Sequence, residues 1–181
     1  MKTFPEIITE RLLLRQVTED DKPKVFEGLS RPDMILYYGV SYKTLEDTQV
    51  QMDWFKQIWE DGTGIWWALT LKENPAELIG ACGFNHRHPT HLNAEIGFWI
   101  LPPYQGKGLM KEAALEVLRY GFTTFGLHRI YAMVETPNTS SNQLVLKLGF
   151  TLEGCQRETE WKNGQFIDLN WYGLLKHEFL K

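Results

Sequence analysis

The chain has 181 residues, of which 43% are hydrophobic and 23% charged, and its formal net charge is −4. This is the composition of an ordinary globular protein that can bury a substantial core. The negative charge argues against direct nucleic-acid binding and would not repel an amine.

The sequence also bears on where the protein works. No apolar run approaches transmembrane length, and the N-terminus lacks the apolar core of a signal peptide, so we expect no membrane association. Cys82 and Cys155 both lie in apolar stretches. This predicts reduced core thiols and a cytoplasmic location.

The first third of the chain predicts one strand and two helices. The apolar run Glu10–Gln16 has the length of a strand, and Thr18–Asp21 resembles a capping box that starts a helix over Lys22–Ser30. A second helix is predicted over Thr44–Asp61. Its apolar residues recur at helical spacing, at Val50, Trp54, Ile58 and partly Phe55.

A hairpin follows, with strands at Ile65–Leu71 and Leu78–Asn85 and a turn at Asn74-Pro75. The next connection contains three histidines, His86, His88 and His91. Their spacing could suggest a metal site, but no acidic or cysteine partner accompanies them at a recognisable spacing. We therefore favour a polar hairpin loop and expect no metal.

The centre of the chain predicts a crossover between two parallel strands. Ala94–Leu101 alternates as a half-buried strand does, and a helix is expected from Gly108 to about Phe125, followed by a strand over Arg129–Val134. A strand, helix and strand of this length form a right-handed crossover, so the two strands should be parallel.

The last third predicts a short helix and a hairpin. Pro137 to Ser140 opens a helix that runs through Lys147. Thr151–Trp161 and Gln165–Leu175 flank Asn163-Gly164, and Asn-Gly between two strands is the strongest short-range hairpin signal. Without repeats or linkers, we expect one α+β domain over residues 1–181.

The turn Gln105–Met110 between the central strand and helix is the first candidate site. Two of its residues are glycines at the start of a helix, where free N–H groups and the helix dipole can hold an anion. It is neither a Walker A loop nor GxGxxG. A plain strand-to-helix connection would also contain such a turn.

Two spaced motifs resemble the GNAT N-acetyltransferases. Gln105 and Gly108 match that family's pyrophosphate-binding pattern, Gln/Arg-x-x-Gly-x-Gly/Ala, and Met110 departs from it. Asn138 and Ser141, followed by the segment 148–150, match its Asn-x-x-Ala/Ser…Gly-Phe segment. The opening segment 9–15 and the tail (149–154, Arg157, Gly164, Asp168) resemble one branch, the ribosomal-protein alanine N-terminal acetyltransferases.

The resemblance implies a fold and a donor. The fold is α+β, with a mixed, mostly antiparallel, twisted sheet of about seven strands, helices on both faces and a splayed central cleft. The donor is acetyl-CoA, without a metal. Its pyrophosphate would take backbone N–H groups of the turn, and the pantetheine arm would follow the preceding strand. The implied cofactor-binding residues are Phe98, Trp99, Ile100, Gln105, Gly106, Lys107, Gly108, Leu109, Met110 and Asn138. The alternative role of Asn138 is that of a helix N-cap or turn residue.

Acyl transfer to an amine needs the neutral amine as nucleophile. At pH 7 an α-amino group is about a sixth neutral and a lysine only about 0.04%, so a protein N-terminus demands less of a base. Glu95 is the candidate base, because it is the carboxylate in the strand that leads to the donor site. Alternation alone also permits a carboxylate there.

The acid that protonates the departing thiolate is less obvious. Many GNAT enzymes place a tyrosine seven residues after the asparagine, but that position here is Val145. Ser141 resembles the serine that the ribosomal-protein branch uses, although an ordinary helix-surface serine explains it equally well. Tyr172 is a third, more distant candidate.

We therefore expect an acetyl-CoA-dependent N-acetyltransferase, most readily one that acts on a protein N-terminus by direct attack. Neither cysteine lies in an activating context, so we expect no covalent intermediate. Two alternatives stay open: a small-amine acceptor (a polyamine, antibiotic or amino acid), and an inactive CoA-binding module. The protein would be a monomer or homodimer. Four tryptophans, Trp66, Trp67, Trp99 and Trp171, would suit an enclosed pocket or simply the core.

Overall fold

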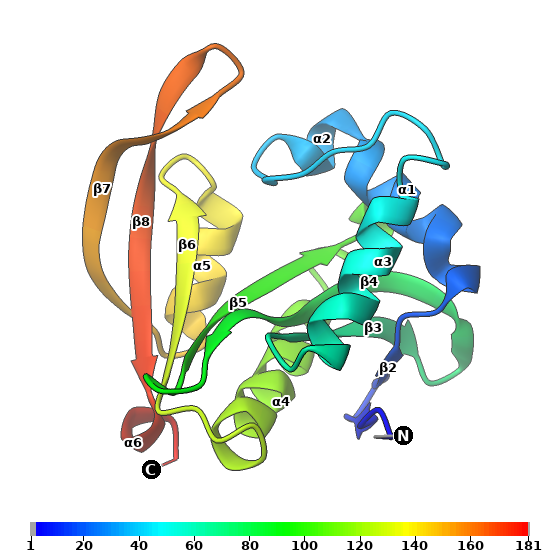
Figure 1. The fold of residues 1–181 in the computed structure, drawn as a ribbon, viewed down its shortest axis with the longest axis horizontal. Coiled ribbons are helices and arrows are strands. Elements are labelled where there is room, and N and C mark those ends of the chain that lie inside the picture. Colours follow the sequence, from blue (N-terminus) through cyan, green and yellow to red (C-terminus); the bar gives the residue numbers. More distant parts are fainter. Residues whose placement is uncertain (1–2, 181) are drawn as a thin grey trace.

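The structure, a computed structural model, describes residues 3–180, so both ends of the predicted 1–181 domain lie outside it. It contains one eight-stranded sheet in the order β1-β2-β3-β4-β5-β6-β8-β7 (Figure 1). All neighbouring pairs are antiparallel except β5 and β6. The strands are β1 (Ile7–Ile8), β2 (Leu12–Gln16), β3 (Ile65–Leu71), β4 (Asn74–His88), β5 (Asn93–Ile100), β6 (Arg129–Glu135), β7 (Thr151–Lys162) and β8 (Gln165–Leu175).

Helices cover both faces of this sheet. The α-helices are α1 (Lys22–Ser30), α2 (Pro32–Ile35), α3 (Gln49–Glu60), α4 (Leu109–Thr123), α5 (Thr139–Lys147) and α6 (Lys176–Phe179). Buried side chains of α4 and α5 belong to one apolar cluster, whereas those of α1 and α3 belong to a second cluster around Trp66 and Trp99. Figure 1 shows α3 and α4 on opposite sides of the sheet. None of these helices is long and apolar enough to cross a membrane.

The central strands form a fork, by which we mean the divergence of β5 from β6. The two strands pair in parallel only where Asn93–Glu95 faces Arg129–Tyr131. Beyond this point β5 stays paired with β4 as far as Ile100, and β6 stays paired with β8 as far as Glu135. The inner edges of the fork therefore carry backbone groups without a strand partner, and Figure 1 shows the strands separating.

Several predictions from local signals are confirmed. The helix over Lys22–Ser30 and the strand over Ile65–Leu71 have the predicted bounds. The central crossover joins parallel strands. The β7–β8 hairpin turns at Asn163 and Gly164, whose φ angles are 51° and 82°, as an Asn-Gly turn requires.

The second helix was predicted with the wrong start and with a buried face that is right at Phe55 and Ile58 but wrong at Val50. α3 begins at Gln49 instead of Thr44, because residues 44–48 form turns in which Thr44 Oγ1 accepts the Asp47 N–H. Val50 is 67% exposed. The buried residues of α3 are Gln51, Met52, Phe55 and Ile58. Helical spacing of apolar residues does not distinguish a buried core position from the wall of a cavity, and Val50 lies in such a wall.

Two further predictions were wrong for reasons of tertiary placement. His86 and His88 belong to β4, which is longer than predicted, and only His91 lies in the hairpin turn. Cys155 is exposed because β7 is an edge strand that no helix covers, whereas Cys82 is buried. Within residues 3–180, no group of three His, Cys, Asp or Glu side chains is arranged to hold a metal.

Asn142 attaches the start of α5 to the two strands beside it. Its Nδ2 donates to the carbonyl oxygens of Asn138 (2.8 Å) and Glu135 (3.0 Å). Its Oδ1 accepts from Asn170 Nδ2 (2.9 Å) and from the hydroxyl of Tyr172 (2.6 Å). This single amide therefore fixes α5 against the end of β6 and against β8.

We predict that Asn142→Ala lowers the free energy of unfolding by about 2–3 kcal/mol, because it removes the acceptor of the buried Tyr172 hydroxyl and of the Asn170 amide. Urea denaturation monitored by circular dichroism measures this. The neighbouring Gln143 is exposed, so Gln143→Ala should stay within about 0.5 kcal/mol of the wild type. Equal stability of the two variants would show that Asn142 does not hold α5.

Candidate functional site

The turn before α4 is built to receive an anion. Gly106 and Gly108 have φ angles of 72° and 77°, a left-handed conformation that favours glycine. No backbone N–H from Gly106 through Met110 donates a hydrogen bond to any residue from 3 to 180. A Cβ atom added at Gly106 would meet nothing within 4 Å, so the space above the turn is open. Consecutive free N–H groups at a helix start suit a pyrophosphate.

The side chain of Arg11, in the segment before β2, holds this turn in place. Arg11 Nη1 donates to the carbonyl oxygen of Lys107 (2.9 Å), and Arg11 Nε donates to Glu112 Oε2 (2.7 Å). Burial raises the pKa of Glu112, but bonds from Thr9 and Arg11 outweigh this and lower it. Arg11 thereby neutralises a carboxylate that would otherwise repel an anion at the start of α4. Motif reading did not single out this role of Arg11.

The strand before the turn presents its two faces differently. Phe98 and Ile100 are half-buried on the α4 side. The side chain of Trp99 is buried on the other side against α1, where a Cβ on Gly28 would come 2.5 Å from the indole. Only the backbone of Trp99 can therefore face the fork. Gln105 Nε2 donates to the Ile100 carbonyl (3.1 Å), which ties the turn to the end of β5.

A cavity of about 560 Å³ lies beside the fork. Its wall comes from the loop after α2, from α3, from β3, β4, β5 and β6, from the start of α5 and from the β7–β8 hairpin. Of the predicted site residues, Glu95, Phe98, Asn138 and Ser141 lie in this wall. Trp99, Ile100 and the turn residues 105–110 do not, so the cavity is a space separate from the anion turn.

Glu95 is held at the cavity by two neighbours from β4. Asn85 Nδ2 donates to Glu95 Oε2 at 3.0 Å, and His86 Nε2 lies 3.8 Å from the same oxygen. Glu95 Oε1 has no hydrogen bond to the described chain. Burial raises the pKa of Glu95, while His86 and Asn85 oppose the rise and Glu160 adds to it. A carboxylate with a raised pKa and one free oxygen is suited to accept a proton.

The floor beside Glu95 is the indole of Trp66. This ring lies across two glycines on the neighbouring strands, Gly83 and Gly97, which occupy the same register position. A Cβ on Gly97 would come 2.6 Å from Trp66, so the glycines make room for the ring. Of the four tryptophans considered for a pocket, only Trp66 lines the cavity. Other aromatic wall residues, which sequence reasoning did not single out for the site, are Tyr37, Tyr38, Tyr42 and Trp54.

Asn138 and Ser141 lie together at the start of α5. Asn138 Oδ1 accepts the Ser141 N–H (3.2 Å), so Asn138 caps the helix. The Asn138 amide nitrogen and the Ser141 hydroxyl donate to no side chain or backbone in residues 3–180, and both residues line the cavity. Val145 is fully buried, and the Tyr172 hydroxyl is bound to Asn142 and lies outside the wall.

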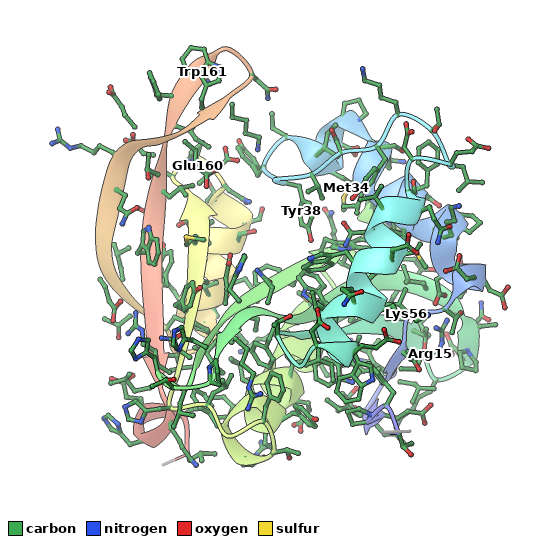
Figure 2. The ribbon with its side chains drawn as sticks, viewed as in Figure 1. Arg15, Met34, Tyr38, Lys56, Glu160 and Trp161 are labelled. Atoms are coloured by element: carbon green, nitrogen blue, oxygen red, sulfur yellow. The ribbon has the colours of Figure 1, made fainter. Side chains whose placement is uncertain are left out.

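The charged wall residues favour a cationic ligand. Lys162 donates to Glu135, which neutralises that pair. Glu160 has no ion pair within the described chain. Figure 2 shows Glu160 on the hairpin and Tyr38 on the opposite side, on the loop after α2. With Glu95 on the floor, carboxylates outnumber cations around this cavity, which attracts a protonated amine.

Comparisons with known proteins agree with this geometry. Residues 11–151 match the family model of the acetyltransferase (GNAT) domain. The chain is 36% identical over 174 residues to the uncharacterized N-acetyltransferase YoaA of Bacillus subtilis, covering 96% of this chain and 98% of that protein. It is 27% identical over 169 residues to the ribosomal-protein-serine acetyltransferase of Escherichia coli, covering 91% and 93%. Among solved structures, spermidine N-acetyltransferase from Vibrio cholerae in complex with CoA and spermine has the same fold, with a TM-score of 0.83 at 23% identity, covering 94% of this chain and 98% of that one.

We predict that Glu95→Gln does not destabilise the protein at pH 7. A carboxyl whose pKa is raised by folding gives a stability that is greatest below its unfolded pKa and falls as the pH rises towards its folded pKa. Glutamine cannot ionise and avoids this loss. The Tm of the variant at pH 7 should equal or exceed that of the wild type, and the difference should shrink below about pH 4.

Glu153 supplies the opposite control. Its pKa is lowered by the hydrogen bond from Arg129, so its stabilising effect is present above the unfolded pKa and is lost on acidification. Glu153→Gln should therefore lower the Tm at pH 7. Thermal unfolding at pH 4 and pH 7 measures both variants, and a marked Tm loss in Glu95→Gln at pH 7 would contradict the burial of an ionised Glu95.

Proposed function

The chain belongs to the GNAT family of acetyltransferases, and on that premise we propose that its acceptor is the α-amino group of a protein N-terminus. The family establishes the coarser statement: the protein is an N-acetyltransferase that uses acetyl-CoA. The acceptor and the roles of individual residues are our proposal. We also propose that the enzyme is cytoplasmic. We further propose that residues 1–181 form one domain, and the single continuous sheet supports this second point.

The donor half of the proposal assigns acetyl-CoA to the fork and the turn. Acetyl-CoA supplies the thioester. The free N–H groups from Gly106 through Met110 would hold its pyrophosphate, and the unpaired edge of β5 at Phe98 and Ile100 would hold the pantetheine arm. An N–H on this edge would polarise the thioester carbonyl as the tetrahedral intermediate forms. Asn138 would donate its free amide N–H to the pantetheine.

The acceptor half rests on Glu95. An amine enters as an ammonium ion, attracted by the carboxylates of the cavity wall, and Oε1 of Glu95 takes its proton directly or through one water. An α-amino group needs modest help from this base because about a sixth of it is already neutral at pH 7. Ser141, whose hydroxyl is free in the same wall, would protonate the departing thiolate. The free Oε1 of a half-buried carboxylate at the fork is the observation that carries the proposal.

A small diamine or polyamine is the second candidate acceptor. Glu160 favours it, because this unpaired carboxylate shares the cavity wall with Glu95 and would bind a second ammonium group. The aromatic wall would contact the carbon chain between the two charges.

An inactive CoA-binding module is a third hypothesis. It rests on Val145, which stands where the family has its tyrosine.

The test is a competition between amine types, scored by CoA release at pH 7. We predict that a peptide with a free N-terminus and no lysine has a kcat/KM some hundreds of times that of the same peptide with a blocked N-terminus and one lysine, since their neutral fractions differ by about that factor. Spermidine should be poorer than the free peptide. A clear preference for spermidine over the free peptide would show that a polyamine, and not a protein N-terminus, is the acceptor.

Two variants accompany this test. Glu95→Gln and Ser141→Ala should each lower kcat at least about tenfold on the preferred amine. Millimolar CoA should raise the Tm of both variants as it does that of the wild type. If neither variant loses tenfold, the assigned roles are wrong; if CoA does not stabilise the wild type, the donor site is wrong.

A further inference from the structure

We propose that His86 conducts the proton from Glu95 to solvent, so that Glu95 and His86 form a proton relay at the acceptor site while Asn85 holds the carboxylate in place. The inference rests on the proposed function, since it assumes that Glu95 accepts a proton from the amine. His86 acts through Glu95, so it is a positioning and relay residue and does not contact the reacting atoms.

The backbone at the end of β4 is irregular where His86 lies. Asn85 pairs with Glu95, but the next pair is His88 with Asn93, so the register shifts between them. His86 has a φ of 52°, a left-handed conformation that is uncommon outside glycine and asparagine. Such bulges turn a side chain away from the face that strand alternation would give it.

The bulge has a specific result. In a regular strand, Asn85 and His86 would point to opposite faces of the sheet. Here both approach the same atom, Glu95 Oε2, with Asn85 Nδ2 at 3.0 Å and His86 Nε2 at 3.8 Å. Asn85 fixes the carboxylate, and a small rotation of the exposed imidazole would close the remaining gap to a hydrogen bond. The other oxygen, Oε1, stays free for the amine.

The reaction leaves one proton that must reach solvent. An ammonium acceptor and acetyl-CoA give an amide, CoA thiol and one proton: the N–C bond forms, the C–S bond breaks, and nitrogen loses two protons, one of which ends on the CoA sulfur. Glu95 takes the other, but its side chain is only 17% exposed. His86 is 71% exposed, and histidine is the residue type that exchanges protons most readily near neutral pH.

His86 also lies between two spaces. It lines the acceptor cavity and a second hollow of about 460 Å³, whose wall includes Trp54, Thr63 and Arg87. A proton on the imidazole therefore has a way out that does not cross the bound acceptor. This placement separates the entry of the amine from the exit of its proton.

The other groups that face Glu95 are less suited to the relay. Tyr131 of β6 and Tyr38 of the loop after α2 have pKa values raised by burial, so they keep their protons at neutral pH. Glu160 of β7 raises the pKa of Glu95 by its charge but makes no hydrogen bond to it. Asn85 does not titrate. Of the groups around Glu95, His86 is thus the one that combines closeness to the carboxylate with exposure to solvent.

The test compares His86→Asn with His88→Asn in weakly buffered solution. Asparagine tolerates positive φ and keeps a polar side chain but cannot carry a proton. His88 lies two residues further along β4 and stacks on His91 (4.1 Å between ring centroids), outside the cavity wall. We expect His86→Asn to lower kcat about tenfold with the KM for the amine unchanged within about twofold. His88→Asn should behave as wild type.

Added imidazole distinguishes proton transfer from structure. It should restore the kcat of His86→Asn in a concentration-dependent way without affecting the wild type, because the exposed site admits a small base. An unchanged kcat in His86→Asn, or a loss that imidazole does not restore, would overturn the relay. Millimolar CoA should stabilise both variants equally, as evidence that they are folded.

A second readout does not need turnover. Carbon-13 NMR of the Glu95 carboxyl should show a higher pKa in His86→Asn than in the wild type, because His86 lowers it. An unchanged Glu95 pKa would contradict the coupling of the two residues. If the wild type acetylates no amine, the proposed function fails; if it does so and His86→Asn behaves as wild type, only the relay fails.

Discussion

The short pairing between β5 and β6 is the constraint on which the site depends. The two strands share only the register from Asn93–Glu95 to Arg129–Tyr131, because each then follows its other partner, β4 or β8. Unpaired backbone groups inside a protein are costly, so a fork of this kind is a place for a ligand that supplies the missing hydrogen bonds. Glu95 stands at the last paired position, so the proposed base sits at the vertex where donor and acceptor would meet.

The two sides of the fork carry opposite electrostatic character. At the turn before α4, free N–H groups and the dipole of a fifteen-residue helix favour an anion, and Arg11 removes the opposing charge of Glu112. In the cavity, Glu95 and Glu160 favour a cation, while Glu135 is neutralised by Lys162. An anionic donor and a cationic amine are thus directed to different ends of one site. This is the arrangement that a direct transfer between them requires.

Local signals predicted most of the framework and part of the site. Helix α1, strand β3, the parallel crossover and the Asn-Gly hairpin follow from capping, alternation and turn chemistry, which act over a few residues. Glu95 and the glycine turn became candidates because the expected order of strand, turn and helix places both beside the donor site. Three residues were misplaced because their positions depend on contacts with distant segments. Val50 faces a cavity instead of the core, Cys155 is exposed on an edge strand, and His86 lies at a β-bulge. The sequence did not reveal that Arg11 holds the turn before α4, because its partners, Lys107 and Glu112, lie far along the chain.

The most direct measurement is a crystal structure with a bisubstrate analogue, in which CoA is joined through an acetyl linker to the N-terminal nitrogen of a short peptide. The pyrophosphate should lie within hydrogen-bond distance of the N–H groups from Gly106 to Met110. The linked nitrogen should lie about 3 Å from Glu95 Oε1 or be joined to it by one water. The peptide should leave through the cavity between the loop after α2 and the β7–β8 hairpin. A linked nitrogen remote from Glu95 would contradict its role as the base, and a pyrophosphate bound away from the turn would contradict the donor site.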